Sequence, residues 1–165
     1  MYQKILLFSF TASFLSLAAA LVAEYGFGLM PCELCILQRI PYGVVMALSL
    51  AGLKFSRTAR TFLLYMILLC FLSDTAIATY HSLVEKHWVK GPDACTSSVA
   101  ATPLSLEEML QKIEAAPIVA CDQPQWQWHG ITMAMLNAIW SFCLSCAMVF
   151  AIRRESNAKA AGRFK

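Results

Sequence analysis

The chain has 165 residues, of which 59% are hydrophobic and 14% are charged, and its formal net charge is +3. A soluble globular domain carries about 25% charged residues, so this composition argues against a soluble enzyme or binding domain. The small excess of Lys and Arg reflects where the loops lie in a membrane protein and is not evidence for nucleic-acid binding.

A membrane-spanning helix needs about 20 mostly apolar residues. Four stretches meet or approach that length, namely 5–23, 36–53, 61–80 and 130–152. The second stretch contains Arg39 and the third contains Asp74, whereas the first and last carry no charge. The sequence therefore predicts an all-α membrane protein, a four-helix transmembrane bundle that forms a single membrane domain over residues 1–165.

The first apolar stretch could also be read as a secretory signal. Its apolar run is longer than the roughly 7–15 residues of such a signal, so we expect it to be retained as a helix. Removal of this segment would leave the other three stretches in place across the membrane.

Basic residues indicate the orientation, because cytoplasmic loops are enriched in Lys and Arg. Here they precede the first stretch, join the second to the third and follow the last: Lys4, Lys54, Arg57, Arg60, Arg153, Arg154, Lys159, Arg163 and Lys165. We expect both termini, the loop 54–60 and the tail 153–165 to be cytoplasmic. The loops 24–35 and 81–129 would then be periplasmic, on the outer side of a bacterial inner membrane.

Four of the seven cysteines fall in these outer loops, namely Cys32, Cys35, Cys95 and Cys121. Disulfides form and persist in that oxidising compartment. Loops at the same end of a four-helix bundle can meet, so the two cysteine pairs could exchange with each other.

The first pair forms the motif Cys32-Glu33-Leu34-Cys35, which follows Pro31. Proline suits the first turn of a helix, and a helix N-terminus and a nearby cation both stabilise a thiolate. Arg39 would lie one turn beyond Cys35, about 5–6 Å away, at a depth where a charge is costly. We favour a redox site. A structural disulfide, with Arg39 extending to lipid headgroups, is the alternative.

The second pair, Cys95 and Cys121, encloses a segment with a capping box at Ser105–Glu108. Residues 105–114 are predicted to form a short amphipathic interfacial helix or the lid of a small outer fold. Taken alone, this pair is also typical of a structural disulfide. It lacks the close spacing of a four-cysteine zinc site, so no metal is expected.

Several other residues are expected to be structural. Trp126, Trp128 and His129 lie where interfacial anchors gather, and Cys70 is a small apolar residue of the third helix. Cys143 and Cys146 would lie about 20 Å below the outer end of the fourth helix, too deep to meet the loop cysteines. Asp74 is expected to be neutral or hydrogen bonded within the bundle, and proton delivery is the alternative.

In this order, the motifs resemble the DsbB family of disulfide-bond-formation membrane proteins. The matching segments are Pro31-Cys32-x-x-Cys35-x-x-x-Arg39, Tyr80-His81 through Gly91-Pro92 to Cys95, and Cys121-x-x-x-Gln125-Trp126 followed by Gly130-Ile131. The resemblance covers almost the whole chain, and its ordered set of motifs is more specific than any one of them.

The resemblance implies a quinone-dependent thiol:disulfide oxidoreductase. Cys95, paired with Cys121, would be attacked by a reduced DsbA-like periplasmic thioredoxin-fold oxidase. Cys121 would exchange with Cys32, and Cys35 would pass electrons to bound ubiquinone or menaquinone. Arg39 and His81 would contact that quinone.

Two other classes of protein fit the sequence less well. A membrane scaffold or accessory protein with two purely structural disulfides would show no coupling between thiols and quinone. A haem-binding bundle needs axial ligands that face each other within helices, whereas the three histidines all lie near the outer edge.

Overall fold

The computed structural model describes residues 2–54, 57–92 and 119–163. Four long helices dominate it: α1 (Tyr2–Leu21), α2 (Glu33–Lys54), α3 (Arg57–Glu85) and α5 (Met133–Arg163). Each contains a segment long and apolar enough to cross a membrane. The predicted all-α four-helix membrane bundle is confirmed, whereas Cys95 and the predicted amphipathic segment 105–114 lie outside the described residues.

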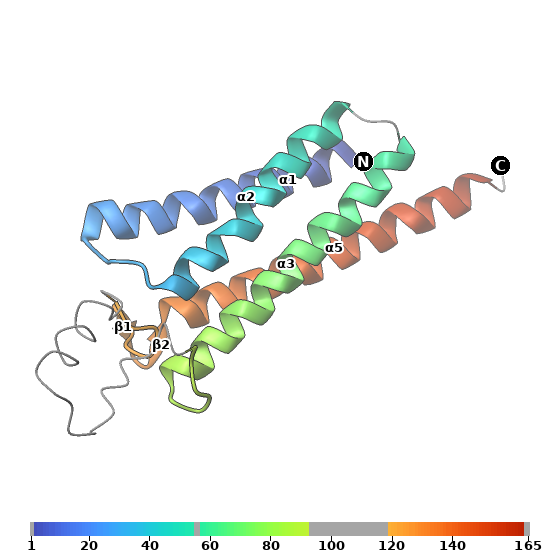
Figure 1. The fold of residues 1–165 in the computed structure, drawn as a ribbon. Coiled ribbons are helices and arrows are strands. Elements are labelled where there is room, and N and C mark those ends of the chain that lie inside the picture. The colour runs from blue at the N-terminus through green and yellow to red at the C-terminus, as the bar shows by residue number, and fades with distance from the viewer. Residues whose placement is uncertain (1, 55–56, 93–118, 164–165) are drawn as a thin grey trace, which may run out of the picture.

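The two ends of the bundle differ in what they carry. Figure 1 shows both termini and the connection between α2 and α3 at one end, and the α1–α2 connection and the strands at the other. The basic segments therefore share one end of the bundle. Cys32 and Cys35, at the start of α2, lie at the opposite end.

The helices pack in a definite order. α3 packs against both α2 and α5, and α1 packs mainly against α2. The core of the bundle is a cluster of buried apolar side chains that includes Leu6, Val45, Ile67, Phe71 and Met148. Cys70 is half-buried and packs against this cluster, as expected for a small apolar residue.

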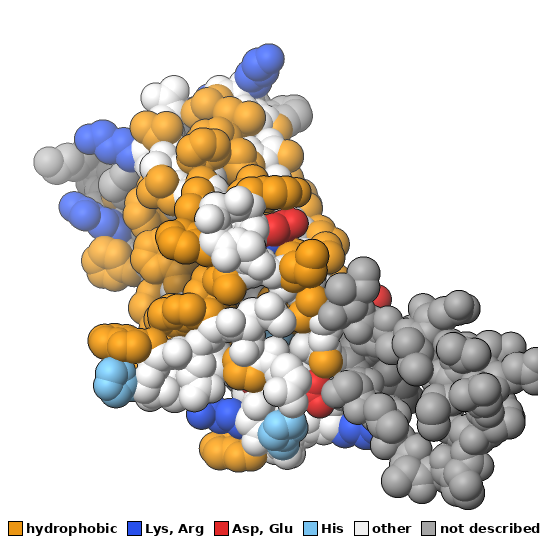
Figure 2. Space-filling view, turned by 90° about the vertical axis from the view of Figure 1, so that its left-hand side faces the viewer, with side chains coloured by type: hydrophobic (Ala, Val, Ile, Leu, Met, Phe, Trp, Pro, Cys, Tyr) orange, Lys and Arg blue, Asp and Glu red, His pale blue; other side chains and the backbone are white. Residues whose placement is uncertain are grey.

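Apolar side chains also cover the outside of the bundle. Leu7, Phe14, Phe62, Leu69 and Phe150 are each more than half exposed. Figure 2 shows hydrophobic side chains over much of one face, with Lys and Arg towards its upper and lower ends. So large an exposed apolar surface is expected where the surroundings are lipid, and Cys143 and Cys146 are exposed on this outer surface.

The third helix is longer than predicted. The sequence analysis ended it at residue 80 and began the outer loop at 81, but α3 continues to Glu85. His81 and Glu85 therefore lie one turn apart on a regular helix. This difference fixes the position of His81 relative to the start of α2.

The fourth helix starts later than predicted because a hairpin precedes it. Strands β1 (Gln127–Trp128) and β2 (Ile131–Thr132) pair antiparallel and leave a two-residue turn of His129 and Gly130. Both turn residues have positive φ, 49° for His129 and 80° for Gly130, as a type I′ hairpin turn requires. α5 therefore begins at Met133 instead of residue 130.

The first helix ends in a π-helical turn, η1 (Val22–Gly26). Such turns change the direction of side chains near the end of an α-helix. The Leu29 N–H donates to the Ala23 carbonyl at 3.1 Å, which closes this end. Glu24 lies on the turn and can reach towards α2.

Candidate active site

The start of α2 brings Cys32 and Cys35 together. Cys32 directly precedes the first helical residue, and its Sγ accepts a hydrogen bond from the Cys35 backbone N–H at 3.4 Å. Both residues are thiols, and Cys32 Sγ donates to Cys35 Sγ at 3.1 Å. Cys35 is therefore the sulfur placed to carry negative charge, in the first turn of a helix that favours it.

The two sulfurs differ in their protonation. The hydrogen bond to Cys35, together with burial of the side chain, raises the pKa of Cys32 to about 12. The hydrogen bond from His81 acts in the opposite direction and is weaker. Cys32 therefore keeps its proton at neutral pH while Cys35 accepts it in a hydrogen bond.

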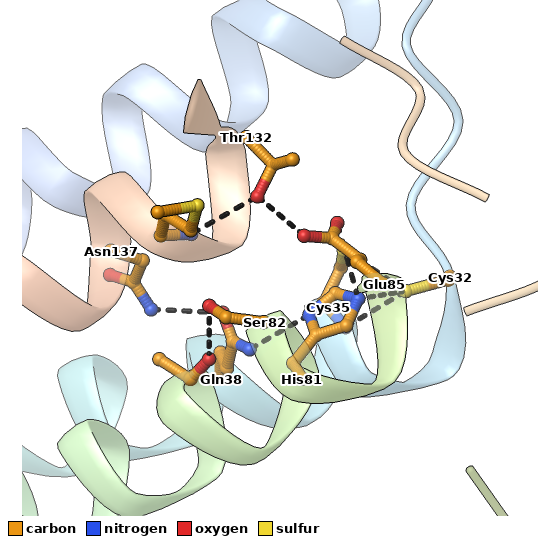
Figure 3. Close-up of polar contacts among 10 residues, drawn as sticks. Cys32, Cys35, Gln38, His81, Ser82, Glu85, Thr132 and Asn137 are labelled. Carbon is orange, nitrogen blue, oxygen red and sulfur yellow. Dashed lines mark hydrogen bonds and ion pairs between the residues drawn. The ribbon is translucent and has the colours of Figure 1, made fainter. Parts of the chain in front are cut away.

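His81 approaches Cys32 from α3. Its Nε2 atom lies 3.5 Å from Cys32 Sγ and 3.7 Å from Oε1 of Glu85. Its side chain is 2% exposed, so His81 is a buried neighbour of the cysteines and not an interfacial residue of the outer loop. Figure 3 shows the ring between Gln38 on one side and Cys32 and Glu85 on the other.

Thr132 connects this site to the start of α5. Its hydroxyl donates to Oε2 of Glu85 and accepts the backbone N–H of Met135 at 3.3 Å. The second contact is a helix cap, which satisfies one of the N–H groups that lack a partner within the first turn. Glu85 is thus held between His81 and the beginning of α5.

A chain of polar side chains leads from His81 into the bundle. Gln38 Nε2 lies 3.0 Å from His81 Nδ1, and Asn137 Nδ2 donates to Gln38 Oε1 at 2.9 Å. Asn137 also donates to Oδ2 of Asp74 at 3.2 Å, and its Oδ1 accepts from the Tyr42 hydroxyl at 2.8 Å. The expectation that Asp74 is bonded within the bundle is confirmed.

Arg39 is paired with Glu24, an acid that was not predicted to belong to the site. Its Nη1 atom lies 2.5 Å from Oε2 of Glu24, and the two side chains are 23% and 20% exposed. The pair joins α2 to the π-turn η1. Arg39 lines the same pocket as Cys35 and Cys32. The carboxylate of Glu24 compensates its charge there.

That pocket has a volume of about 560 Å³. Its wall is mainly apolar and comes from α1 and α5, including Leu15, Ala19, Ala20, Leu136 and Trp140. The lining also includes polar groups, among them Cys35, Gln38, Arg39 and His81. An apolar wall with a few polar groups is typical of a small-molecule site.

Cys121 reaches the first cysteine pair. It is 1% exposed and belongs to the same buried cluster as Cys32, Leu34 and Val84, against which Cys35 also packs. The structure therefore brings three of the four predicted redox cysteines into one cluster. The fourth, Cys95, lies outside the described residues.

These side chains are also close enough to share a cation. The ligand atoms of Cys32, Cys35 and His81 lie within 4.8 Å of one another, and thiolate and imidazole are ligands that zinc prefers. Any such ion would occupy both thiols, so its binding would compete with disulfide formation between them.

A family model described as "Disulfide bond formation protein DsbB" matches residues 2–151. The chain belongs to the DsbB family. It is 35% identical to an uncharacterised protein of Rickettsia prowazekii over 145 residues. The aligned region covers 87% of this chain and 83% of the relative. It is 33% identical over 138 residues to Disulfide bond formation protein B of Xylella fastidiosa, with 78% and 77% covered.

A third relative has the same name. Disulfide bond formation protein B of Xanthomonas axonopodis pv. citri is 29% identical over 151 residues, with 85% of this chain and 86% of the relative covered. These matches confirm the resemblance seen in the motifs. The chain is a disulfide bond formation membrane protein with the role of a disulfide oxidoreductase, and its four spans fit a multi-pass protein of the inner membrane.

The sequence analysis missed several residues of the site. Glu24, Gln38, Glu85 and Asn137 were not predicted as site residues, although each is a polar residue within or beside an apolar stretch. Gln38 and Asn137 interrupt two of the predicted spans, and a polar side chain in lipid needs a partner. That signal could have identified them as inward-facing, but not as neighbours of His81.

Proposed function

We propose that the chain reoxidises a DsbA-like periplasmic thiol oxidase and passes the electrons through two cysteine pairs to ubiquinone or menaquinone. One observation carries the proposal. Cys32, Cys35 and Cys121 share a buried cluster that borders an apolar pocket. A buried thiol pair beside a lipophilic pocket can connect a water-soluble reductant to an acceptor that dissolves in the membrane.

The first exchange takes place in the outer loops. A thiolate of the reduced partner attacks Cys95, the Cys95–Cys121 bond breaks, and Cys121 leaves as a thiolate. The second thiol of the partner then attacks the mixed disulfide. The partner departs as a disulfide, and Cys95 is released as a thiol.

The second exchange involves the pair at α2. The Cys121 thiolate attacks Sγ of Cys32, the Cys32–Cys35 bond breaks, and Cys35 leaves as a thiolate. Cys95 then attacks Cys121, which restores the loop disulfide and releases Cys32. Two electrons have passed from the partner to Cys32 and Cys35, and two protons from the partner's thiols balance them.

The positions of the two sulfurs support this order of attack. Cys32 and Cys121 are the two buried cysteines of the cluster, so Cys32 is the natural target of Cys121. Cys35 accepts the hydrogen bond of the reduced pair, which makes it the better leaving group. A sulfur that leaves more readily as a thiolate speeds disulfide exchange.

The pocket residues would hold the acceptor. A bound quinone supplies an acceptor for two electrons and two protons. The apolar wall from α1 and α5 would bury its ring, while Arg39 offers donor N–H groups in a fixed fork and His81 offers an N–H beside Cys32. Orientation with the cysteines towards the periplasm is supported by the basic residues at the opposite end of the bundle.

The test is coupled turnover by the purified full-length protein in detergent. A reduced DsbA-like protein and a short-chain ubiquinone are mixed with the enzyme, and partner oxidation and quinone reduction are followed together. We expect equal rates for the two, and loss of both in Cys35→Ser. Cys143→Ser, which alters an exposed cysteine of α5, is the matched control. Wild-type turnover by Cys35→Ser, or stable disulfides with no quinone reduction, would favour the structural-disulfide alternative.

A further inference from the structure

Four polar side chains form one hydrogen-bonded chain from Asp74 in the bundle to the cysteines. We propose that Asn137, acting through Gln38, is a positioning residue that holds His81 with its Nε2–H directed at Cys32. The inference rests on the proposed redox role of Cys32, but the geometry that it describes can be measured without turnover.

The burial of these groups needs an explanation. Asp74 is fully buried, His81 is 2% exposed and Gln38 is 6% exposed. Burying a polar side chain without partners costs several kcal/mol, and an ionisable residue within a membrane span usually has a functional reason. Asp74 lies on α3 about two turns before His81, and Asn137 on α5 bridges the distance between them.

The contact with Asp74 determines which atoms donate and which accept along this row of hydrogen bonds. Asn137 Nδ2 donates to Oδ2 of Asp74 at 3.2 Å, so the Asn137 amide turns its NH₂ group towards this carboxyl group. The Tyr42 hydroxyl then donates to the Asn137 oxygen at 2.8 Å. The remaining N–H of Asn137 points to Oε1 of Gln38, at 2.9 Å. The orientation of one amide therefore fixes that of the next.

The orientation of the Gln38 amide determines which nitrogen of His81 accepts a hydrogen bond. Because its oxygen is used by Asn137, its NH₂ group faces His81 Nδ1, at 3.0 Å. Nδ1 must then accept, and in a neutral imidazole the proton is on the other nitrogen, Nε2. The neighbours of Nε2 are acceptors, Cys32 Sγ at 3.5 Å and Glu85 Oε1 at 3.7 Å. Figure 3 shows Asn137, Gln38, His81 and Cys32 in this sequence.

The Nε2–H tautomer of His81 affects Cys32 during thiol exchange. When Cys121 returns to Cys95, Cys32 leaves as a thiolate, and an N–H directed at its sulfur stabilises that charge. The opposite tautomer would turn a nitrogen lone pair towards both the sulfur and the Glu85 carboxylate, which would repel it. The chain from Asp74 therefore selects the tautomer that assists the release of Cys32.

Nitrogen NMR tests the tautomer directly. The full-length reduced protein is labelled with ¹⁵N-histidine in detergent micelles. It contains three histidines, so the loss of one set of signals in His81→Ala assigns His81. We expect a protonated Nε2 and an unprotonated Nδ1 in the wild type. Gln38→Glu replaces the NH₂ group with acceptors only and should move the proton to Nδ1, whereas Asn137→Leu should give a mixture.

A second measurement connects the tautomer to Cys32. The rate of Cys32 alkylation at pH 9 is measured by mass spectrometry in the reduced protein. Asn137→Leu should slow it by less than the roughly tenfold that follows complete loss of a hydrogen bond to a charged group, because only part of the population then directs an N–H at Cys32. Ser145→Ala is the control: it removes a buried hydroxyl from the same helix, and that hydroxyl bonds only within α5, to the Ser141 carbonyl at 2.9 Å.

Several outcomes would overturn the inference. A wild-type His81 protonated on Nδ1 would do so, as would ¹⁵N shifts that are the same in wild type, Gln38→Glu and Asn137→Leu. If Asn137→Leu does not fold, Gln38→Glu on α2 still decides the tautomer. A protein with the expected tautomer that fails to reduce quinone would support the positioning chain and refute the proposed function, so the two failures are distinguishable.

Discussion

The Nε2 atom of His81 lies 3.5 Å from the Sγ atom of Cys32, although 49 positions separate the two residues in the chain. The contact joins the last turns of α3 to the first residue before α2. It places an imidazole beside the buried sulfur of the pair, and Cys35 Sγ lies 3.1 Å from the same sulfur. Cys32 therefore has a different environment from Cys35, and the predictions below use that difference.

Cys32 should make the stability of the reduced protein depend on pH in the alkaline range. Its pKa is raised from the ordinary 9.0 to about 12 by the Cys35 hydrogen bond and burial. A pKa raised on folding adds stability that is fully present below about pH 9 and is lost as the pH rises towards about 12. We expect thermal stability of the reduced protein to fall over that range more steeply in wild type than in Cys32→Ala. Parallel curves for the two proteins would contradict the assignment.

Arg39 should act as a bidentate cation and not only as a charge. Arg39→Lys keeps the charge but loses the planar fork, so we expect a higher apparent KM for quinone with little change in kcat. Arg39→Ala should raise KM further. The measurement is steady-state quinone reduction at saturating reduced partner. If the lysine variant is silent and the alanine variant nearly so, Arg39 only anchors the helix.

Substitution of Glu24 tests whether its ion pair with Arg39 contributes to quinone use. Its carboxylate lies 2.5 Å from Arg39 Nη1, so Glu24→Gln should leave the guanidinium less firmly held. In a double-mutant cycle, the effects of Glu24→Gln and Arg39→Ala on KM should be non-additive, because the two side chains are in contact. Additive effects would mean that the pair does not act together in quinone use.

Thr132 should stabilise the bundle through its cap on α5. Thr132→Ala removes the acceptor for the Met135 N–H and the donor to Glu85. Loss of an N-cap costs about 1 kcal/mol, and we expect at least that loss in unfolding by sodium dodecyl sulfate titration. Thr132→Ser retains the hydroxyl and should be close to wild type. Equal stability of the alanine and serine variants would exclude the capping role.

Cys95 should be the residue that meets the partner. A DsbA-like protein lacking its second active-site cysteine should form a trapped mixed disulfide with wild type, and mass spectrometry should locate the bond at Cys95. In Cys121→Ser, Cys95 is a free thiol, so this variant should still form the complex when the remaining cysteine of the partner is supplied as an activated disulfide, whereas Cys95→Ser should not. A bond to Cys121 would reverse the proposed order of attack, and no complex with any folded variant would favour structural disulfides.

The sequence by itself determined the class of protein. Backbone groups in lipid must be hydrogen bonded in helices or closed barrels, and apolar stretches of about 20 residues have the length of spanning helices. Each of α1, α2, α3 and α5 overlaps one of the four stretches. The Cys32–Cys35 motif after Pro31 was likewise readable, because its consequences lie within one helical turn. Such local features depend only on neighbours in the chain.

The tertiary structure decided which polar residues meet. A helix surrounded by lipid and apolar neighbours is hydrophobic all round, so its pattern does not tell which face turns inward. Gln38 meets His81 across 43 positions and Asn137 across 99, and both contacts depend on how α2, α3 and α5 pack. Glu85, in the part of α3 beyond the predicted end, also accepts a hydrogen bond from Thr132 of the hairpin before α5. Long-range packing, and not any local pattern, therefore set His81 between Cys32 and the buried chain that ends at Asp74.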